Sequence, residues 1–302
     1  MNKIIILSIT LIFATLTAMS QTYHEDDKEG LRVFLRQPSA EKGKINAEQL
    51  GLKIEDTLNW QSDEEWVSKI IGLIWNNEIS KRLVTIGFND GVRFYEWRSK
   101  KLAGTLDASK WTELGSLNCS GNQLTALNLS ANTKLATLHC SDNQLSILDL
   151  RANTKLVMLF CDHNLLTALN LSVDAKLHTL HCSGNHLLLS DLFVPFHVLK
   201  NDKTNKDYYY LSPQTLPAQT IRRGEKLEFS TPQNVFNGIY TEYTVIQNDK
   251  PTSKKKYTVT DGKISFNTIG IYTVTMTNKA IFSTISKKKY PAEVIIKVKV
   301  RE

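Results

Sequence analysis

The four cysteines of the chain fall 21 residues apart, and its 302 residues contain no others: Cys119, Cys140, Cys161 and Cys182. Thiols at a regular spacing could form disulfides or hold a metal ion. Equivalent positions on stacked strands lie about 4.8 Å apart, so distance alone does not exclude a disulfide. However, parallel side chains have poor geometry for a disulfide, and four thiols in a line cannot form the tetrahedron that zinc prefers. The spacing therefore favours a ladder of reduced, buried cysteines over disulfides or a metal site, and it predicts no cofactor.

Histidine and aspartate side chains near the cysteines are the second candidates for chemistry. His139 and His181 would lie two repeats apart, about 10 Å, with Phe160 between them, which is too far for one zinc ion. Three further titratable residues come close together in the repeat: Asp142, Asp162 and His163. No serine or cysteine nucleophile is placed beside a base. We therefore expect the chain not to be an enzyme, and a hydrolase is kept as a third hypothesis.

The cysteines belong to a longer repeat that must position them. An asparagine follows each cysteine by three residues: Asn122, Asn143, Asn164 and Asn185. The full unit reads L-x-x-L-x-C-x-x-N-x-L-x-x-L-x-L-S-x-N-T-K. Apolar residues at fixed offsets are typical of a solenoid, because one unit cannot bury its apolar side without a stacked neighbour.

Each unit contains two similar halves. Three positions recur ten residues later, namely Leu117, Cys119 and Asn122 as Leu127, Leu129 and Asn132. The L-x-C and L-x-L segments predict short strands, and an inward asparagine can satisfy amide groups that a turn leaves unpaired. We expect two parallel sheets and two asparagine ladders, with little helix. This pattern resembles the nested 21-residue class of bacterial leucine-rich repeat proteins.

The chain before the repeats predicts a small helical cap over residues 21–105. Acidic residues precede Leu31, Phe34 and Leu35, which have the i, i+3, i+4 spacing of a helix with charge favourably placed at its N-terminus. We also expect a short helix at 47–50 with Asn46 as its N-cap, a helix at 63–74, a strand at 82–88 and a turn at 89–91. The segments G-L-I-W, R-L-V-T-I and L-A-G-T-L-D make this region similar to the caps of leucine-rich repeat proteins. Such a cap covers the apolar end of a solenoid.

The repeat register decays after Cys182, so we predict a solenoid over 106–200 and a polar linker over 201–219. Three tyrosines at 208–210 interrupt this linker, and we expect their rings to cover the last rung. Six or more short strands with turns then predict a β-sandwich over 220–302. The segment Gly-Ile-Tyr-Thr-Val at 270–274 is similar to a late strand of immunoglobulin-like domains, in which a tyrosine ties down a corner two residues before a core position. The resemblance implies that Tyr272 has this role and that Val274 takes the place of a cysteine. The expected fold is mainly β: a leucine-rich repeat solenoid with a small helical cap and a C-terminal immunoglobulin-like sandwich.

The first 20 residues predict a cleaved signal peptide. Lys3 precedes an apolar run from residue 4 to 18, and Ala-Met-Ser stands before Gln21. An uncleaved membrane anchor is the alternative. We therefore expect an exported protein, secreted or associated with the cell surface, whose mature chain has no membrane span.

The formal net charge of +7 is concentrated in the C-terminal region. Residues 203–302 contain 17 basic and 8 acidic residues, whereas 22–113 contain 14 and 16, and 114–199 contain 4 and 5. We expect no nucleic-acid partner, because an exported protein seldom meets one and the charges are scattered. The lysine runs at 254–256 and 287–289 predict solvated turns, with a patch for an anionic surface as the alternative.

The residues beside the cysteines are the candidate binding residues. One outward row is expected to contain Asn118, His139, Phe160 and His181. Met158 and Asp162 lie outward on the same rung as Phe160. An exposed aromatic residue flanked by polar groups resembles a protein-binding hot spot, and harmless substitution in a drifting repeat is the alternative.

The family resemblance implies a binding or adhesion module for an extracellular or host protein, with a glycan as another candidate ligand. A C-terminal secretion or surface-sorting signal is the second hypothesis, and fold alone cannot name the ligand.

Overall fold

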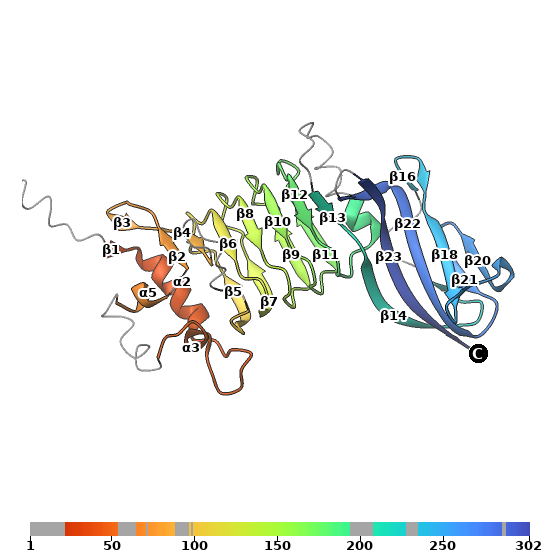
Figure 1. The fold of residues 1–302 in the computed structure, drawn as a ribbon, viewed down its shortest axis with the longest axis horizontal. Coiled ribbons are helices and arrows are strands. Elements are labelled where there is room, and N and C mark those ends of the chain that lie inside the picture. The colour runs from red at the N-terminus through yellow and green to blue at the C-terminus, as the bar shows by residue number, and fades with distance from the viewer. Residues whose placement is uncertain are drawn as a thin grey trace, which may run out of the picture.

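The computed structural model describes residues 22–53, 65–70, 72–87, 97, 99–193, 208–227, 235–285 and 288–302. These residues form a rod in which a helical cap, a stack of short strands and an antiparallel sandwich follow one another (Figure 1). The expected mainly β class, with a leucine-rich repeat sheet, a helical cap and a C-terminal antiparallel region, is confirmed. The predicted signal peptide at 1–20 lies outside the described residues. No helix among them is long and apolar enough to cross a membrane.

The cap combines short helices with the first strands. Its elements are β1 (Thr22–Tyr23), α2 (Glu25–Leu35), α3 (Asn46–Gln49), α5 (Glu65–Lys69), β2 (Leu73–Trp75), β3 (Ser80–Lys81) and β4 (Leu83–Ile86). The helix α2 begins where the His24 side chain accepts a hydrogen bond from the Asp26 amide, and three acidic residues occupy its first turn. Its apolar face is buried, with Leu31 and Leu35 fully inaccessible to solvent.

Two details of the predicted cap are wrong. The helix expected over 63–74 has a different end: Gly72, with φ of +84°, precedes strand β2, which pairs antiparallel with β4. Backbone pairing with β4 therefore overrides the helical spacing of the apolar residues. In α3 the N-cap is Ile45, whose amide donates to the Glu48 carboxylate at 2.9 Å. The turn predicted at 89–91 lies outside the described residues.

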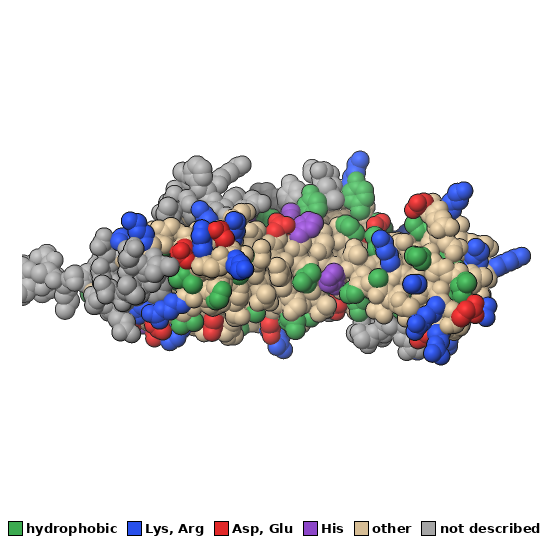
Figure 2. Space-filling view, turned by 90° about the horizontal axis from the view of Figure 1, so that it is seen from below, with side chains coloured by type: hydrophobic (Ala, Val, Ile, Leu, Met, Phe, Trp, Pro, Cys, Tyr) green, Lys and Arg blue, Asp and Glu red, His purple; other side chains and the backbone are tan. Residues whose placement is uncertain are grey.

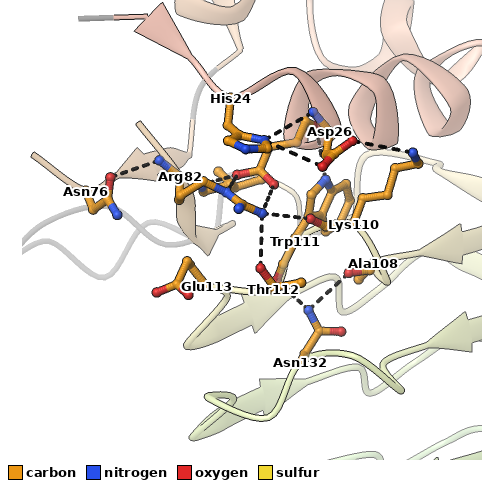
Figure 3. Close-up of polar contacts among 12 residues, drawn as sticks. His24, Asp26, Asn76, Arg82, Ala108, Lys110, Trp111, Thr112, Glu113 and Asn132 are labelled. Atoms are coloured by element: carbon orange, nitrogen blue, oxygen red, sulfur yellow. Dashed lines mark hydrogen bonds and ion pairs between the residues drawn. The ribbon is translucent and has the colours of Figure 1, made fainter. Parts of the chain in front are cut away.

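An ion pair between buried Asp27 and Arg82 fixes helix α2 on strand β4 (Figure 3). Arg82 donates from Nε and Nη2 to the two carboxylate oxygens of Asp27, at 2.9 Å each, and the Leu83 amide donates to the same carboxylate at 2.7 Å. The Trp111 indole donates to the Asp27 carbonyl at 3.1 Å. These bonds satisfy a carboxylate that has no solvent exposure, and the pairing raises the pKa of Arg82. Helix α2 is thus anchored to β4, the strand that pairs with the first solenoid strand of the main sheet.

The solenoid strands occupy two faces. They are β5 (Ala103–Asp107), β6 (Ser116–Asn118), β7 (Gln123–Asn128), β8 (Thr137–His139), β9 (Ile147–Leu150), β10 (Met158–Phe160), β11 (Ala168–Leu171), β12 (Thr179–His181) and β13 (Tyr208–Tyr210). The first face continues β2 and β4 with the parallel strands β6, β8, β10, β12 and β13. Its register is the 21-residue period, so that Leu138 lies opposite Leu117 and Leu159. The second face consists of two separate pairs, β5 with β7 and β9 with β11.

Part of the predicted linker continues the solenoid. Strand β13 pairs parallel with β12, which places Tyr209 opposite Leu180, and both side chains are buried. Leu211 occupies the place that Cys182 has on the preceding rung, although it follows after 29 residues rather than 21. Because of this longer interval, the rung does not fit the 21-residue period of the sequence.

Most of the C-terminal strands belong to two facing sheets. The strands of this region are β14 (Gln214–Arg222), β15 (Lys226–Leu227), β16 (Val235–Phe236), β17 (Ile239–Tyr240), β18 (Glu242–Gln247), β19 (Lys250–Pro251), β20 (Tyr257–Thr260), β21 (Lys263–Phe266), β22 (Gly270–Ile285) and β23 (Lys288–Arg301), with the 3-10 turn η1 (Lys254–Lys256). One sheet has the order β14-β23-β22-β18-β19 and the other β15-β21-β20, and β16 and β17 form a separate antiparallel pair. Tyr272 donates from its hydroxyl to the Thr268 carbonyl at 3.1 Å, and Val274 is fully buried. Tyr272 therefore forms the corner contact that the immunoglobulin-like resemblance implies.

Candidate functional site

The four cysteines lie in the core of the solenoid. All are unpaired and have no solvent exposure. Burial raises the pKa of the Cys119 thiol to about 12, and it raises the pKa values of Cys140, Cys161 and Cys182 above their ordinary value. While they are buried and protonated, these thiols cannot act as nucleophiles or bind a metal ion. Among the described residues, no group of three or more His, Cys, Asp or Glu side chains could hold a metal ion.

An asparagine ladder runs beside the cysteines and holds the rungs together. Asn143 donates from Nδ2 to the carbonyls of Cys119 and Cys140 at 3.0 and 3.1 Å, and its Oδ1 accepts from the Leu124 amide at 3.0 Å. The same pattern is made by Asn122, Asn164 and Asn185. Gln214 continues it on the next rung, where Nε2 donates to the Cys182 carbonyl at 2.8 Å. These amides fix the backbone that presents the outward side chains.

Four aromatic side chains stand in register on the outer surface of this sheet. The rings of His139 and Phe160 have centroids 4.3 Å apart, Phe160 and His181 4.6 Å, and His181 and Tyr210 4.3 Å, with tilts of 43° to 57°. All four are partly exposed. We call His139, Phe160, His181 and Tyr210 the aromatic row. The sequence indicates its first three members, but Tyr210 falls outside the 21-residue period.

Polar and apolar side chains flank the aromatic row. Met158, 36% exposed, lies on one side. On the other side, Asp162 accepts hydrogen bonds from the hydroxyls of Ser141 and Ser183 at 3.2 and 3.0 Å. The His181 Nδ1 lies 4.0 Å from the Asp162 carboxylate, and burial lowers the pKa of His181 despite this neighbour. At pH 7 this surface therefore carries the neutral imidazole of His181 beside the Asp162 carboxylate, which two serine hydroxyls hold in place.

The cap closes the first rung of this surface. Asn118, expected to face outward, is 1% exposed, and its Oδ1 accepts from the Ser120 amide at 3.1 Å. Gly87 approaches so closely that a Cβ there would lie 2.1 Å from the Asn118 carbonyl oxygen. The exposed row therefore begins at His139.

The residues considered for hydrolysis do not form a nucleophile and base pair. Asp142 and His163 occupy equivalent left-handed turn positions, with φ of +55° and +52°, and both are exposed. The serine hydroxyls of Ser141 and Ser183 donate to Asp162. A carboxylate held in this way accepts hydrogen bonds but does not set a histidine to take a serine proton.

No protein-family model and no curated protein matches the chain. Several solved structures are similar to part of it, among them two from Listeria monocytogenes and one from Arabidopsis thaliana. InlP of Listeria monocytogenes is 19% identical, with 64% of this chain and 55% of that chain covered and a TM-score of 0.37. The BIR2 ectodomain of Arabidopsis thaliana is 16% identical, with 55% and 83% covered and a TM-score of 0.39. The functional domain of InlJ of Listeria monocytogenes, described as including a cysteine ladder, is 18% identical, with 65% and 50% covered and a TM-score of 0.30.

The chain thus spans about half the length of the two Listeria proteins that it resembles. The leucine-rich repeat assignment rests on the strand register and the buried ladders of this chain itself.

Proposed function

We propose that the chain is an exported binding module that recognises a protein partner noncovalently through the sheet surface bearing the aromatic row. The proposal rests on one observation, that four partly exposed rings lie in register on β8, β10, β12 and β13. Such rings bury a large area at a small cost in side-chain entropy, and aromatic residues are enriched at interface hot spots.

The surroundings of the aromatic row support recognition rather than chemistry. The strands are fixed by the asparagine ladder and by parallel pairing, so the rings are held in place before a partner arrives. Asp162 is positioned by two serine hydroxyls and can accept a hydrogen bond from a partner at the edge of the contact. The row spans about 14 Å at the usual strand spacing, a suitable length for the centre of a protein interface.

A binding screen with matched variants tests this proposal. The full chain is screened against extracellular proteins and glycans, and any ligand found is measured with Phe160→Ala and Met158→Ala. We expect Phe160→Ala to weaken binding about 30-fold, the effect of a hot-spot truncation of about 2 kcal/mol. The control is Ile147→Ala, which removes a 56% exposed apolar side chain from the second face. A ligand that binds the Phe160→Ala and Met158→Ala variants as tightly as the parent chain would show that the site lies elsewhere.

A surface-sorting role for the C-terminal domain is the alternative. Strand β23 contributes the buried side chains of Val294, Val298 and Val300 and is paired on both edges, with β14 and β22. Cleavage of β23 from the chain would take a central strand out of the sheet. We therefore favour a permanent C-terminal domain over a signal that is removed. Mass spectrometry of the exported protein distinguishes the two roles, because a processed sorting signal would leave a product that lacks this strand.

A further inference from the structure

The outer surface of the C-terminal sandwich carries a row of cations. On β23, Lys297, Lys299 and Arg301 alternate with the buried residues Val298 and Val300, so all three point outward and are exposed. Arg222 on the neighbouring strand β14 lies opposite Arg301 in the register and is also exposed. We call Arg222, Lys297, Lys299 and Arg301 the basic row.

The four cations of the basic row have no carboxylate partner among the residues that the structure describes. The nearby acidic groups are engaged elsewhere: Glu302 pairs with Arg223 at 3.2 Å, and Glu225 accepts from the Arg222 main-chain amide at 2.7 Å. Like charges on adjacent strands repel one another. An anionic ligand would relieve this repulsion between Arg222 and Arg301.

The residues that lie opposite Lys297 and Lys299 on the adjacent strands are neutral. In the register, Lys299 lies between Thr220 of β14 and Ile271 of β22, and Ile271 is 63% exposed. Thr273 lies opposite Lys297. Figure 2 shows that Lys and Arg side chains outnumber Asp and Glu side chains over this end of the molecule. The surface thus combines cations in a line with hydroxyl groups and one exposed apolar side chain.

We infer that the basic row binds a linear acidic polysaccharide. Alternate residues of a strand lie about 6.8 Å apart, so the three cations of β23 form a line rather than a cluster. A line of cations on a sheet complements an extended chain that carries carboxylate or sulfate groups at regular intervals. The threonine hydroxyls can hydrogen-bond sugar hydroxyls, and Ile271 offers an apolar contact for a sugar ring. This site is on another domain from the aromatic row and does not depend on it.

Polysaccharide binding by charge-matched variants of the full chain tests the inference. The probes are heparin and alginate, with binding measured at low and at physiological salt. We expect the triple variant Lys297→Gln, Lys299→Gln, Arg301→Gln to bind about tenfold more weakly, as the loss of three exposed ion pairs implies. The control removes the same charge from another part of the sandwich, with Lys250→Gln, Lys254→Gln and Lys255→Gln, and should change the affinity by no more than about twofold.

Three results would overturn the inference. Equal weakening by both triple variants would show that the basic row has no special part in binding, and that net charge or the lysine run at 254–256 accounts for the attraction. Equally tight binding to polyglutamate, or to anionic phospholipid vesicles in place of heparin and alginate, would assign the surface to an acidic peptide or a membrane. The thermal midpoints of both variants should match the parent chain, since all six side chains are exposed. Phe160→Ala should leave polysaccharide binding unchanged, which separates this test from that of the protein-binding site.

Discussion

At the scale of single residues, burial decides what the cysteines can do. The reactive form of a thiol is the thiolate, and the raised pKa values keep all four sulfurs protonated at neutral pH. We expect a thiol reagent at pH 8 to modify almost none of them in the folded chain and all four after unfolding in denaturant without reductant. Two or fewer thiols after unfolding would reveal disulfides, and rapid reaction of the folded chain would contradict the burial of the ladder.

The same thiols predict a loss of stability at alkaline pH. Well below pH 9.0, the ordinary pKa, the folded and unfolded chains both keep the thiol protons. Between pH 9.0 and about 12 the unfolded chain releases protons that buried Cys119 retains, so the free energy of unfolding decreases as the pH rises. Urea midpoints measured across this range provide the check. The Cys119→Ala variant, though less stable at neutral pH, should show a shallower fall, and an equal fall would assign the effect to other groups.

Gly87 is needed where the cap meets the first rung. Its φ is +78°, and a Cβ would lie 2.1 Å from the Asn118 carbonyl oxygen. We expect Gly87→Ala to lower the free energy of unfolding by about 2 kcal/mol or more, from backbone strain and steric overlap together. Gly115→Ala is the control, because a Cβ there would meet nothing closer than 3.7 Å, and it should change stability by less than about 0.5 kcal/mol. Similar losses in denaturant unfolding would contradict this assignment.

At the scale of elements, the asparagine ladder joins neighbouring rungs. Replacing Asn143 by alanine leaves the buried Leu124 amide without its acceptor and removes the donor to Cys119 and Cys140. Because each unsatisfied buried group costs about 1 to 3 kcal/mol, we expect a loss of roughly 3 kcal/mol in urea unfolding. Asn128→Ala, which removes a hydrogen bond to Asp107 on the exposed strand surface, should cost less than about 1 kcal/mol. Equal costs would mean that the ladder does not hold the rungs.

The sequence predicts most reliably the part of the fold that is built from repeats. Residues 114–185 are predicted well because buried leucines, cysteines and asparagines recur every 21 residues. The sequence predicts that the tyrosines at 208–210 cover the last rung, but not that they form a further strand, β13, because this rung follows after a longer connection. The sequence therefore predicts three members of the aromatic row, and the structure adds a fourth. Two strands can pair in parallel whatever the length of the chain between them, whereas a 21-residue period requires a fixed length.

The edge of the second face shows why the cap resists prediction. Gln37 donates to and accepts from the backbone of Thr105, at 2.8 and 3.0 Å, and Asn46 does the same with Ala103, at 3.0 Å each. These two amides replace a neighbouring strand along β5. Asn46 was expected to cap α3, but its side chain is used 57 residues away. Local spacing predicts caps and helices, whereas such long-range bonds depend on the folded arrangement.

At the scale of the whole molecule, one sheet runs from the cap to the sandwich. Its path includes β2, β4, the solenoid strands of the first face, and then β22 and β23 (Figure 1). The long strand β22 belongs to the sandwich near Val274, while near Thr284 it pairs with β13, the last rung of the solenoid. The sandwich thus closes the apolar end of the solenoid in the way that the cap closes the other end.

Ser283 joins these two domains, and its replacement should loosen the end of the solenoid. Its buried hydroxyl accepts from the Leu211 amide at 3.0 Å, so Ser283→Val leaves that amide unpaired at a cost of about 1 to 3 kcal/mol. A solenoid responds mainly at the nearest rungs, so hydrogen exchange should accelerate in β12 and β13 well before β6. Thr284→Val on the same strand is the control and should leave exchange unchanged. Uniform acceleration along the solenoid would instead show that the rod unfolds as one unit, because the loss at one end would then lower the stability of every rung equally.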